Sequence, residues 1–130
     1  MPGRSSCAAA MTDAIKAVHL QRGRRGEALA ALWLRLRGYR ILARNWRHPA
    51  GEIDILARRG PLLVAVEVKW RGSLDNAAEA VLVQQRRRIA QAAAVFLSRQ
   101  PDAAMLSLRF DAVLLAPGRL PRHIPDAWRL

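Results

Sequence analysis

Hydrophobic and polar positions follow two different periods along the chain, and the changes between them predict its secondary structure. Helical spacing occupies two segments, residues 24–37 and 77–99, which end at Gly38 and before Pro101. Segments rich in Ile, Leu and Val, separated by stretches with Gly or Pro, predict strands over residues 39–46, 51–58, 62–70 and 106–116. The order of helix, three strands, helix and strand predicts a compact α/β domain with a mixed sheet.

The same periods predict which side chains face the core. In the first helix the expected core face has the spacing i, i+3, i+4 and i+7 and consists of Leu29, Leu32, Trp33 and Leu36. In the second helix it consists of Ile89, Ala92, Ala93, Phe96 and Leu97. In the last strand, Leu106, Leu108 and Phe110 alternate with Ser107, Arg109 and Asp111, and we expect Arg109 and Asp111 to form a structural pair.

Charged residues interrupt the two most strand-like segments, residues 51–58 and 62–70. Because side chains alternate between the faces of a strand, Glu52 and Asp54 share one face of the first segment, opposite Ile53 and Ile55. Glu67 and Lys69 share one face of the second segment. A turn at residues 59–61 pairs the segments as antiparallel strands, and this pairing predicts that Asp54 and Glu67 approach each other.

Two neighbouring carboxylates repel each other, and their burial is unfavourable unless a cation compensates. A hard divalent ion held by carboxylates, a backbone carbonyl and waters supplies that cation. Lys69, on the face of Glu67, could position a water or hold a phosphate oxygen. Hydrolysis of a phosphodiester needs this set of groups. The alternative is a solvated face whose ordinary surface charges point to water, and the apolar character of both strands favours the site over that alternative.

The net charge of +12, from 22 basic and 10 acidic residues, implies an anionic partner, and nucleic acid is the commonest one. Codon bias explains why Lys16 and Lys69 are the only lysines, but it does not explain the excess of basic over acidic residues. Two arginine clusters, one before the first helix and one that we expect to open the second, are candidates for phosphate contacts: Arg22, Arg24, Arg25, Arg86, Arg87 and Arg88.

An apolar content of 52% and a mean hydropathy of −0.04 are typical of a soluble globular protein. The apolar runs are shorter than the ~18 residues of a membrane-spanning helix, so we expect no membrane partner. Cys7 is the single cysteine, which excludes an intrachain disulfide and favours the cytoplasm.

We expect a flexible tail over residues 1–15, one domain over residues 16–118 and a C-terminal tail over residues 119–130, anchored by Trp128.

Four segments carry a resemblance to a known family: GEALAALWLRLRGYRILARNWR (26–47), GEIDILA (51–57), VAVEVKWR (64–71) and RFDAVLL (109–115). In order and spacing they resemble the YraN-like family of small bacterial proteins. That family is similar in turn to archaeal Holliday junction resolvases and to other nucleases with the restriction-endonuclease-like fold. The resemblance implies a restriction-endonuclease-like core, a Mg²⁺ or Mn²⁺ ion, DNA rather than RNA as partner, branched DNA among the substrates, and it allows a homodimer.

The resemblance also implies roles for individual residues. Asp54 and Glu67 would be metal ligands and Lys69 the catalytic lysine. Glu27 would be an accessory acid from the first helix, although it lies across that helix from the expected core face. The alternative for Glu27 is a solvated acid at the start of a helix.

Further candidates differ from the pattern of the family or have an ordinary alternative. Gln85 takes the place of a lysine that relatives commonly carry, and its amide could bond the scissile phosphate. Glu52 is a further candidate metal ligand, with a pair to a neighbouring arginine as the alternative. His48 lies beside the predicted hairpin, and we expect all three histidines at the surface rather than in a metal site.

Three hypotheses about function follow. The first is a metal-dependent endonuclease with its site at Asp54, Glu67, Lys69 and Gln85. The second is a nucleic-acid-binding module of the same fold without catalytic activity. The third is an interaction protein whose basic surface meets an acidic protein or ribosomal RNA.

Overall fold

The computed structural model of the chain describes residues 25–70 and 76–129, and for residues 76–84 it describes the backbone alone. Residues 25–36 form a helix, here called the N-terminal helix. The further elements are β1 Arg40–His48, β2 Gly51–Arg59, β3 Leu62–Trp70, α2 Asn76–Ser98, a short 3-10 helix Ala103–Met105, β4 Ser107–Leu115 and β5 Arg122–Ile124. The predicted order of helices and strands is confirmed. Neither helix of the described residues is long and apolar enough to cross a membrane.

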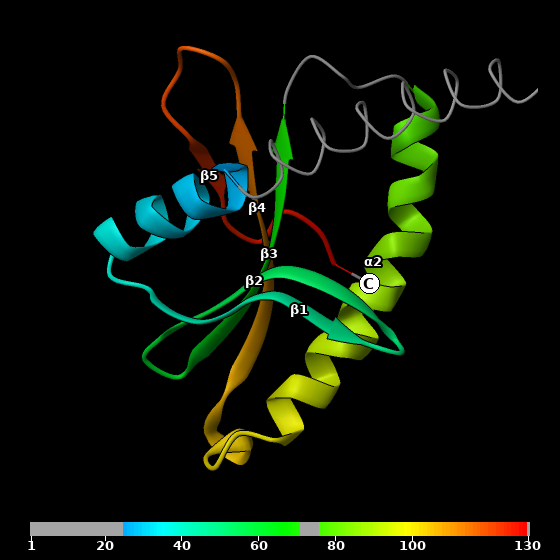
Figure 1. Cartoon of the computed structure of the whole chain (residues 1–130). Coiled ribbons are helices and arrows are strands. Elements are labelled where there is room, and N and C mark those ends of the chain that lie inside the picture. Colours follow the sequence, from blue (N-terminus) through cyan, green and yellow to red (C-terminus); the bar gives the residue numbers. More distant parts are fainter. Residues whose placement is uncertain (1–24, 71–75, 130) are drawn as a thin grey trace, which may run out of the picture.

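Within the described residues the strands form one sheet in the order β1-β2-β3-β4-β5. Neighbouring strands are antiparallel except β3 and β4, which run parallel and are connected through α2. The sheet is therefore mixed, as predicted. The N-terminal helix lies against one face of the sheet and α2 against the other (Figure 1).

Each helix buries an apolar cluster against its face of the sheet. On the side of the N-terminal helix the cluster is formed by Ala30, Ala31, Leu34, Tyr39, Ile55, Ala57, Val64, Val66, Val113 and Leu115. On the side of α2 it is formed by Ile53, Leu56, Leu63, Ala65, Ile89, Ala92, Ala93 and Trp128. The predicted core face of α2 is confirmed, with Phe96 and Leu97 partly buried at its edge.

The predicted core face of the N-terminal helix is wrong. Ala30, Ala31 and Leu34 are buried, whereas Leu29, Leu32 and Leu36 are exposed. The helix has two apolar stripes with the same period, and the one with small side chains lies against the sheet because it permits a closer approach. The approach is close at Gly26 too, where an added Cβ would lie 2.9 Å from the Leu115 and Trp70 side chains.

β2 and β3 separate towards one end of the sheet. Their pairing runs from Arg59↔Leu62 to Ile55↔Val66, whereas β1 stays paired with β2 as far as Gly51 and β4 with β3 as far as Trp70. We call residues 51–54 and 67–70 the strand fork. Ile53 packs on the side of α2 and Ile55 on the opposite side, so the expectation that both share one face is wrong, because alternation changes where the ladder ends.

Residues 119–129, which we expected to form a tail, contribute to the folded domain. β5 pairs with β4 over Ala112↔Ile124 to Leu114↔Arg122. Trp128 is buried and stacks on Phe110 with ring centroids 4.2 Å apart, so its expected anchoring role is confirmed. The predicted tail at residues 1–15 lies outside the described residues.

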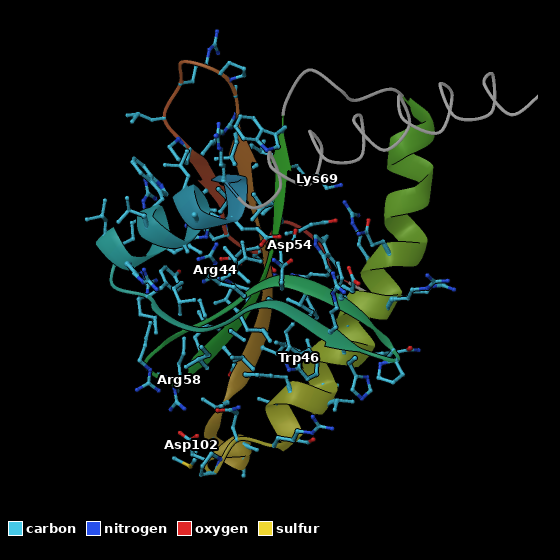
Figure 2. The ribbon with its side chains drawn as sticks, viewed as in Figure 1. Arg44, Trp46, Asp54, Arg58, Lys69 and Asp102 are labelled. Carbon is cyan, nitrogen blue, oxygen red and sulfur yellow. The ribbon has the colours of Figure 1, made fainter. Side chains whose placement is uncertain are left out.

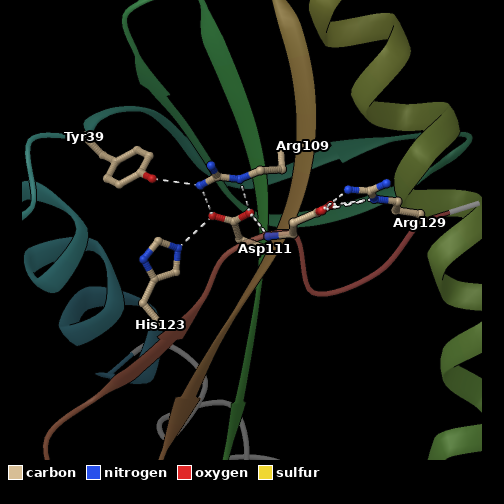
Figure 3. Close-up of polar contacts among 6 residues, drawn as sticks. Tyr39, Arg109, Asp111, His123 and Arg129 are labelled. Atoms are coloured by element: carbon tan, nitrogen blue, oxygen red, sulfur yellow. Dashed lines mark hydrogen bonds and ion pairs between the residues drawn. The ribbon is translucent and has the colours of Figure 1, made fainter.

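A buried polar network ties β4 to β5 (Figure 3). The Asp111 carboxylate accepts hydrogen bonds from Arg109 Nε and Nη2, both at 2.7 Å, and from the backbone N–H of Asp126 at 2.9 Å. His123 Nε2 lies 2.7 Å from the same carboxylate, and Arg109 Nη2 also donates to the Tyr39 hydroxyl. The predicted Arg109–Asp111 pair is confirmed, whereas the side chain of His123, expected at the surface, is only 3% exposed.

Candidate active site at the strand fork

Asp54 lies at the point where the ladder between β2 and β3 ends. Its Oδ2 accepts a hydrogen bond from the Val68 backbone N–H at 2.8 Å. The last paired residues of the ladder are Ile55 and Val66, so the Asp54 side chain takes the place of a backbone acceptor for Val68. This bond fixes the carboxylate between the two strands (Figure 2). The fork therefore positions an acid on β2 against the backbone of β3.

Glu67 and Lys69 come from the adjacent arm of the fork. Glu67 is 7% exposed, and its Oε1 lies 3.5 Å from Lys69 Nζ. Oε1 is buried and accepts no hydrogen bond from the described residues. The Lys69 side chain is 22% exposed and keeps access to solvent. One buried carboxylate oxygen without a hydrogen bond thus lies within ion-pair distance of a partly exposed ammonium.

The electrostatics of the fork disfavour a negative charge on Asp54. The pKa of Asp54 is raised to about 6, chiefly by desolvation and also by the charges of Glu67 and Glu52, against the opposing effects of the Val68 N–H and Lys69. A partly buried acid close to other acids is a common arrangement in functional sites. Near neutral pH, a cation that binds between Asp54 and Glu67 would relieve this unfavourable arrangement.

The other two candidate acids differ from each other in exposure. Glu27 is 7% exposed and lies on the sheet-facing side of its helix, so the expectation that it points away from the core is wrong. Glu52 is exposed and lies 3.4 Å from Arg47, its cross-strand neighbour, which bears out the alternative pairing. Among the described residues no three His, Cys, Asp or Glu side chains form a group that could hold a metal ion.

Gln85 of α2 lines a cavity together with the residues that follow the turn between β1 and β2. A cavity of about 290 Å³ is lined by Gly51, Glu52, Gln85, Arg88 and Ile89. A Cβ added at Gly51 would lie 2.8 Å from the Arg88 carbonyl oxygen, so glycine allows the turn to approach α2 this closely. The cavity brings an acid, an amide and a guanidinium together next to the fork.

Comparison with known proteins places the chain in a family. The sequence profile of the uncharacterised protein family UPF0102 matches residues 26–115. The chain belongs to this family. A UPF0102 protein of Paramagnetospirillum magneticum is 56% identical over 114 residues, which cover 85% of this chain and 88% of that one. A UPF0102 protein of Parvibaculum lavamentivorans is 58% identical over 107 residues, covering 82% and 80%.

A solved structure with the same fold is Hjc of Archaeoglobus fulgidus, a Holliday junction resolvase. The UPF0102 chain superposes on it with a TM-score of 0.50 and 22% identity over 78% of this chain and 73% of Hjc. This likeness shows the fold. The predicted family and the predicted restriction-endonuclease-like core are both confirmed.

The arginines that we expected to contact phosphates occupy different environments in this UPF0102 chain. Arg22 and Arg24 lie outside the described residues, and Arg25 is exposed at the beginning of the N-terminal helix. The other three lie in the middle of α2 rather than at its start. Arg87 and Arg88 are exposed, but Arg86 is half-buried with its guanidinium 5.5 Å from the Trp128 ring, a cation–π contact that sequence reasoning missed.

Asp54→Asn should stabilise the metal-free protein at neutral pH. A carboxyl group whose pKa is raised to about 6 binds more protons when folded than when unfolded, so the stability of the wild type falls as pH rises from about 4 to about 6. Asparagine avoids this loss and can still accept from Val68. We expect a free energy of unfolding higher by about 1–3 kcal/mol at pH 7.5 and little changed at pH 4.

Urea denaturation in the presence of a chelator measures this difference, with Glu52→Gln as the matched control at an exposed acid of the same strand. An Asp54→Asn variant that is destabilised equally at both pH values would show that the fork places no unfavourable charge on Asp54.

Proposed function

We propose that the chain binds nucleic acid and hydrolyses its phosphodiester bonds in a metal-dependent reaction at the strand fork. The observation that carries this proposal is the partly buried Asp54 beside the buried Glu67, where desolvation and like charge raise the pKa of Asp54 to about 6. The resolvase-like fold is consistent with it. Since the solved neighbour is a Holliday junction resolvase, branched DNA is the first substrate that we propose.

The residues of the fork fit Mg²⁺ or Mn²⁺. Mg²⁺ is commonly held by one or two carboxylates together with waters and substrate phosphates, so a third protein acid is not required. Asp54 and Glu67 would hold the ion, with one oxygen of Asp54 already accepting from Val68 and one oxygen of Glu67 paired with Lys69. When bound, the ion would polarise a phosphoryl oxygen and neutralise developing negative charge.

The chain's own groups then have separate tasks. Lys69, next to Glu67 and partly exposed, would donate a hydrogen bond to a phosphate oxygen or orient the attacking water. Gln85 would donate its amide N–H to a neighbouring phosphate without adding charge. The exposed guanidinium groups of Arg87 and Arg88 would contact the backbone beside the scissile bond.

A second candidate function is a nucleic-acid-binding module without catalysis. The observation that favours it is the ion pair between Lys69 and Glu67, which compensates one carboxylate without a metal ion. In this case Asp54 would serve the structure by accepting from Val68 where the ladder ends.

Cleavage assays with Mg²⁺ or Mn²⁺ separate the two functions. We expect the wild type to cut at least one substrate among single strands, duplexes, flaps and four-way junctions, and to stop when the divalent ion is chelated. Tight binding of these nucleic acids without cleavage under any divalent ion would establish the non-catalytic module.

Binding should depend strongly on salt. Contacts to roughly four to eight phosphates give a slope of log affinity against log salt of about −4 to −7. Replacement of Arg87 and Arg88 by alanine should make the slope shallower by about 2. Arg129→Ala is the matched control, since that arginine pairs with Asp126. Fluorescence anisotropy over a salt series gives the slopes, and a slope near zero would exclude binding through the phosphate backbone.

A further inference from the structure

A stripe of leucines is exposed on the outer side of the N-terminal helix. Leu29, Leu32 and Leu36 are 41%, 51% and 73% exposed, and their spacing of three and four residues places them in one line. We call these three residues the leucine stripe. Figure 1 shows the helix lying along the sheet. Its buried residues on the sheet side, Ala30, Ala31 and Leu34, are on the opposite side of the helix from the stripe, so the stripe faces away from the sheet.

Single exposed leucines are common on protein surfaces, but an aligned set on an otherwise folded helix is not. A helix that is apolar on both sides is normally covered on both. In the part of the chain that the structure describes, one side of this helix is covered by the sheet. The stripe therefore has the character of a surface that another molecule covers.

The surroundings of the stripe are basic. Arg25 continues its line at the start of the helix, Arg35 lies beside it and Arg37 follows the last helical residue; all three are exposed, whereas the single acid of the helix, Glu27, is buried. An apolar line with positive edges is complementary to an amphipathic helix that carries an apolar line between acidic residues.

We propose that the leucine stripe docks an amphipathic helix of a partner protein with acidic residues on both sides of its apolar face. A second copy of this chain fits less well, because it would place the arginines of two stripes against each other. Three partly exposed leucines also offer much less than the ~800 Å² per partner of a stable dimer interface, whereas a transient helical motif needs less. A homodimer, which the family resemblance allows, would use another surface.

A membrane surface is also less suited to the stripe. Helices that lie on membranes commonly insert aromatic side chains beside leucines. On this helix Trp33 is half-buried, and the Arg37 guanidinium lies 5.0 Å from the centre of its ring.

Synthetic peptides test the proposal directly. The probe is a fluorescein-labelled 18-residue helical peptide with leucines at i, i+3, i+4 and i+7 and glutamates beside them, and its control is a scrambled peptide of the same composition. We expect the striped peptide to bind the full chain about tenfold or more tightly than the scrambled one. The Leu32→Glu/Leu36→Glu variant should lose about tenfold or more of this affinity, whereas Leu120→Glu, at another exposed leucine, should lose none.

Four outcomes would overturn the proposal. Equal binding of striped and scrambled peptides would show a purely electrostatic attraction, and unchanged binding by the double variant would place the peptide elsewhere. Sedimentation of a dimer that the double variant abolishes would assign the stripe to a second copy. Binding to vesicles of neutral and anionic phospholipid that the double variant abolishes would assign it to a membrane. These results are independent of the proposed activity at the strand fork, because the substituted leucines lie outside the fork.

Discussion

Lys69→Ala should reduce cleavage by about a hundredfold to ten-thousandfold while leaving nucleic-acid affinity within about twofold. Lys69 is the partly exposed ammonium beside Glu67, and alanine removes the group that would meet the reacting phosphate or water. The loss of one cation among 22 basic residues changes backbone binding little. Lys69→Arg should also fail, since a guanidinium is bulkier and remains protonated at any working pH.

Single-turnover cleavage and anisotropy on the same preparations measure both quantities. Asp54→Asn and Glu67→Gln should abolish cleavage as well, because an amide oxygen attracts a divalent ion far less than a carboxylate does. Asp102→Asn is the control, as Asp102 pairs with Arg58 away from the fork (Figure 2). If Lys69→Ala cuts as fast as the wild type, the role assigned to this lysine is wrong even though the chain is a nuclease.

Asp111→Asn should destabilise the fold by about 3 kcal/mol or more at pH 7. Burial raises the pKa of Asp111, but hydrogen bonds from His123, Arg109 and the Asp126 backbone outweigh it and lower the pKa below its ordinary value. The stabilisation is therefore complete above the unfolded pKa near 3.9 and is lost as pH falls through the lower folded value. Asparagine leaves Arg109 and His123 without the buried carboxylate charge that both of them contact.

Urea denaturation of wild type and variant measures this loss. Asp126→Asn is the matched control, because that acid is more exposed and pairs with Arg129 near the surface, where such pairs contribute little. Asparagine also tolerates the positive φ of Asp126. Equal effects of the two substitutions would show that the buried network does not hold β4 and β5 together.

The hairpin and its charge pair could be predicted from the sequence because local rules determine both. The turn at residues 59–61 sets the register, and the pairing Ile55↔Val66 brings the neighbouring positions 54 and 67 together. The fork could not be predicted, since alternation assumes that two strands remain paired to their ends. Ile53 therefore lies on the opposite side from Ile55, and the bond from Val68 to Asp54 has no signal in the spacing of residues.

The orientation of the N-terminal helix was ambiguous for a different reason. Leucines and alanines form two stripes of the same period, and hydrophobicity alone favours the leucines. Close packing against the sheet instead favours the small residues, and this choice also buries Glu27. The residues next to the leucines in the sequence do not indicate which of the two stripes packs against the sheet.

Long-range pairing explains why the sequence did not predict β5. β5 is a strand of three residues between Pro121 and Pro125, too short for a visible alternation. Its place beside β4 depends on Asp111, which binds His123 and the backbone of Asp126, and on the stacking of Trp128 on Phe110. The pairing of Arg109 with Asp111 was predictable because the two residues are two positions apart on one strand.

Binding of Mn²⁺, followed by electron paramagnetic resonance, tests the proposed site most directly. The titration is made on the wild type, Asp54→Asn and Glu67→Gln, each with and without a cleavage-resistant oligonucleotide that can supply phosphate oxygens. We predict that the wild type binds about one equivalent of Mn²⁺ with the oligonucleotide present and that both variants lose this binding while still holding the oligonucleotide. Equal Mn²⁺ binding by all three proteins, or none by the wild type in either condition, would contradict a metal-dependent site at Asp54 and Glu67.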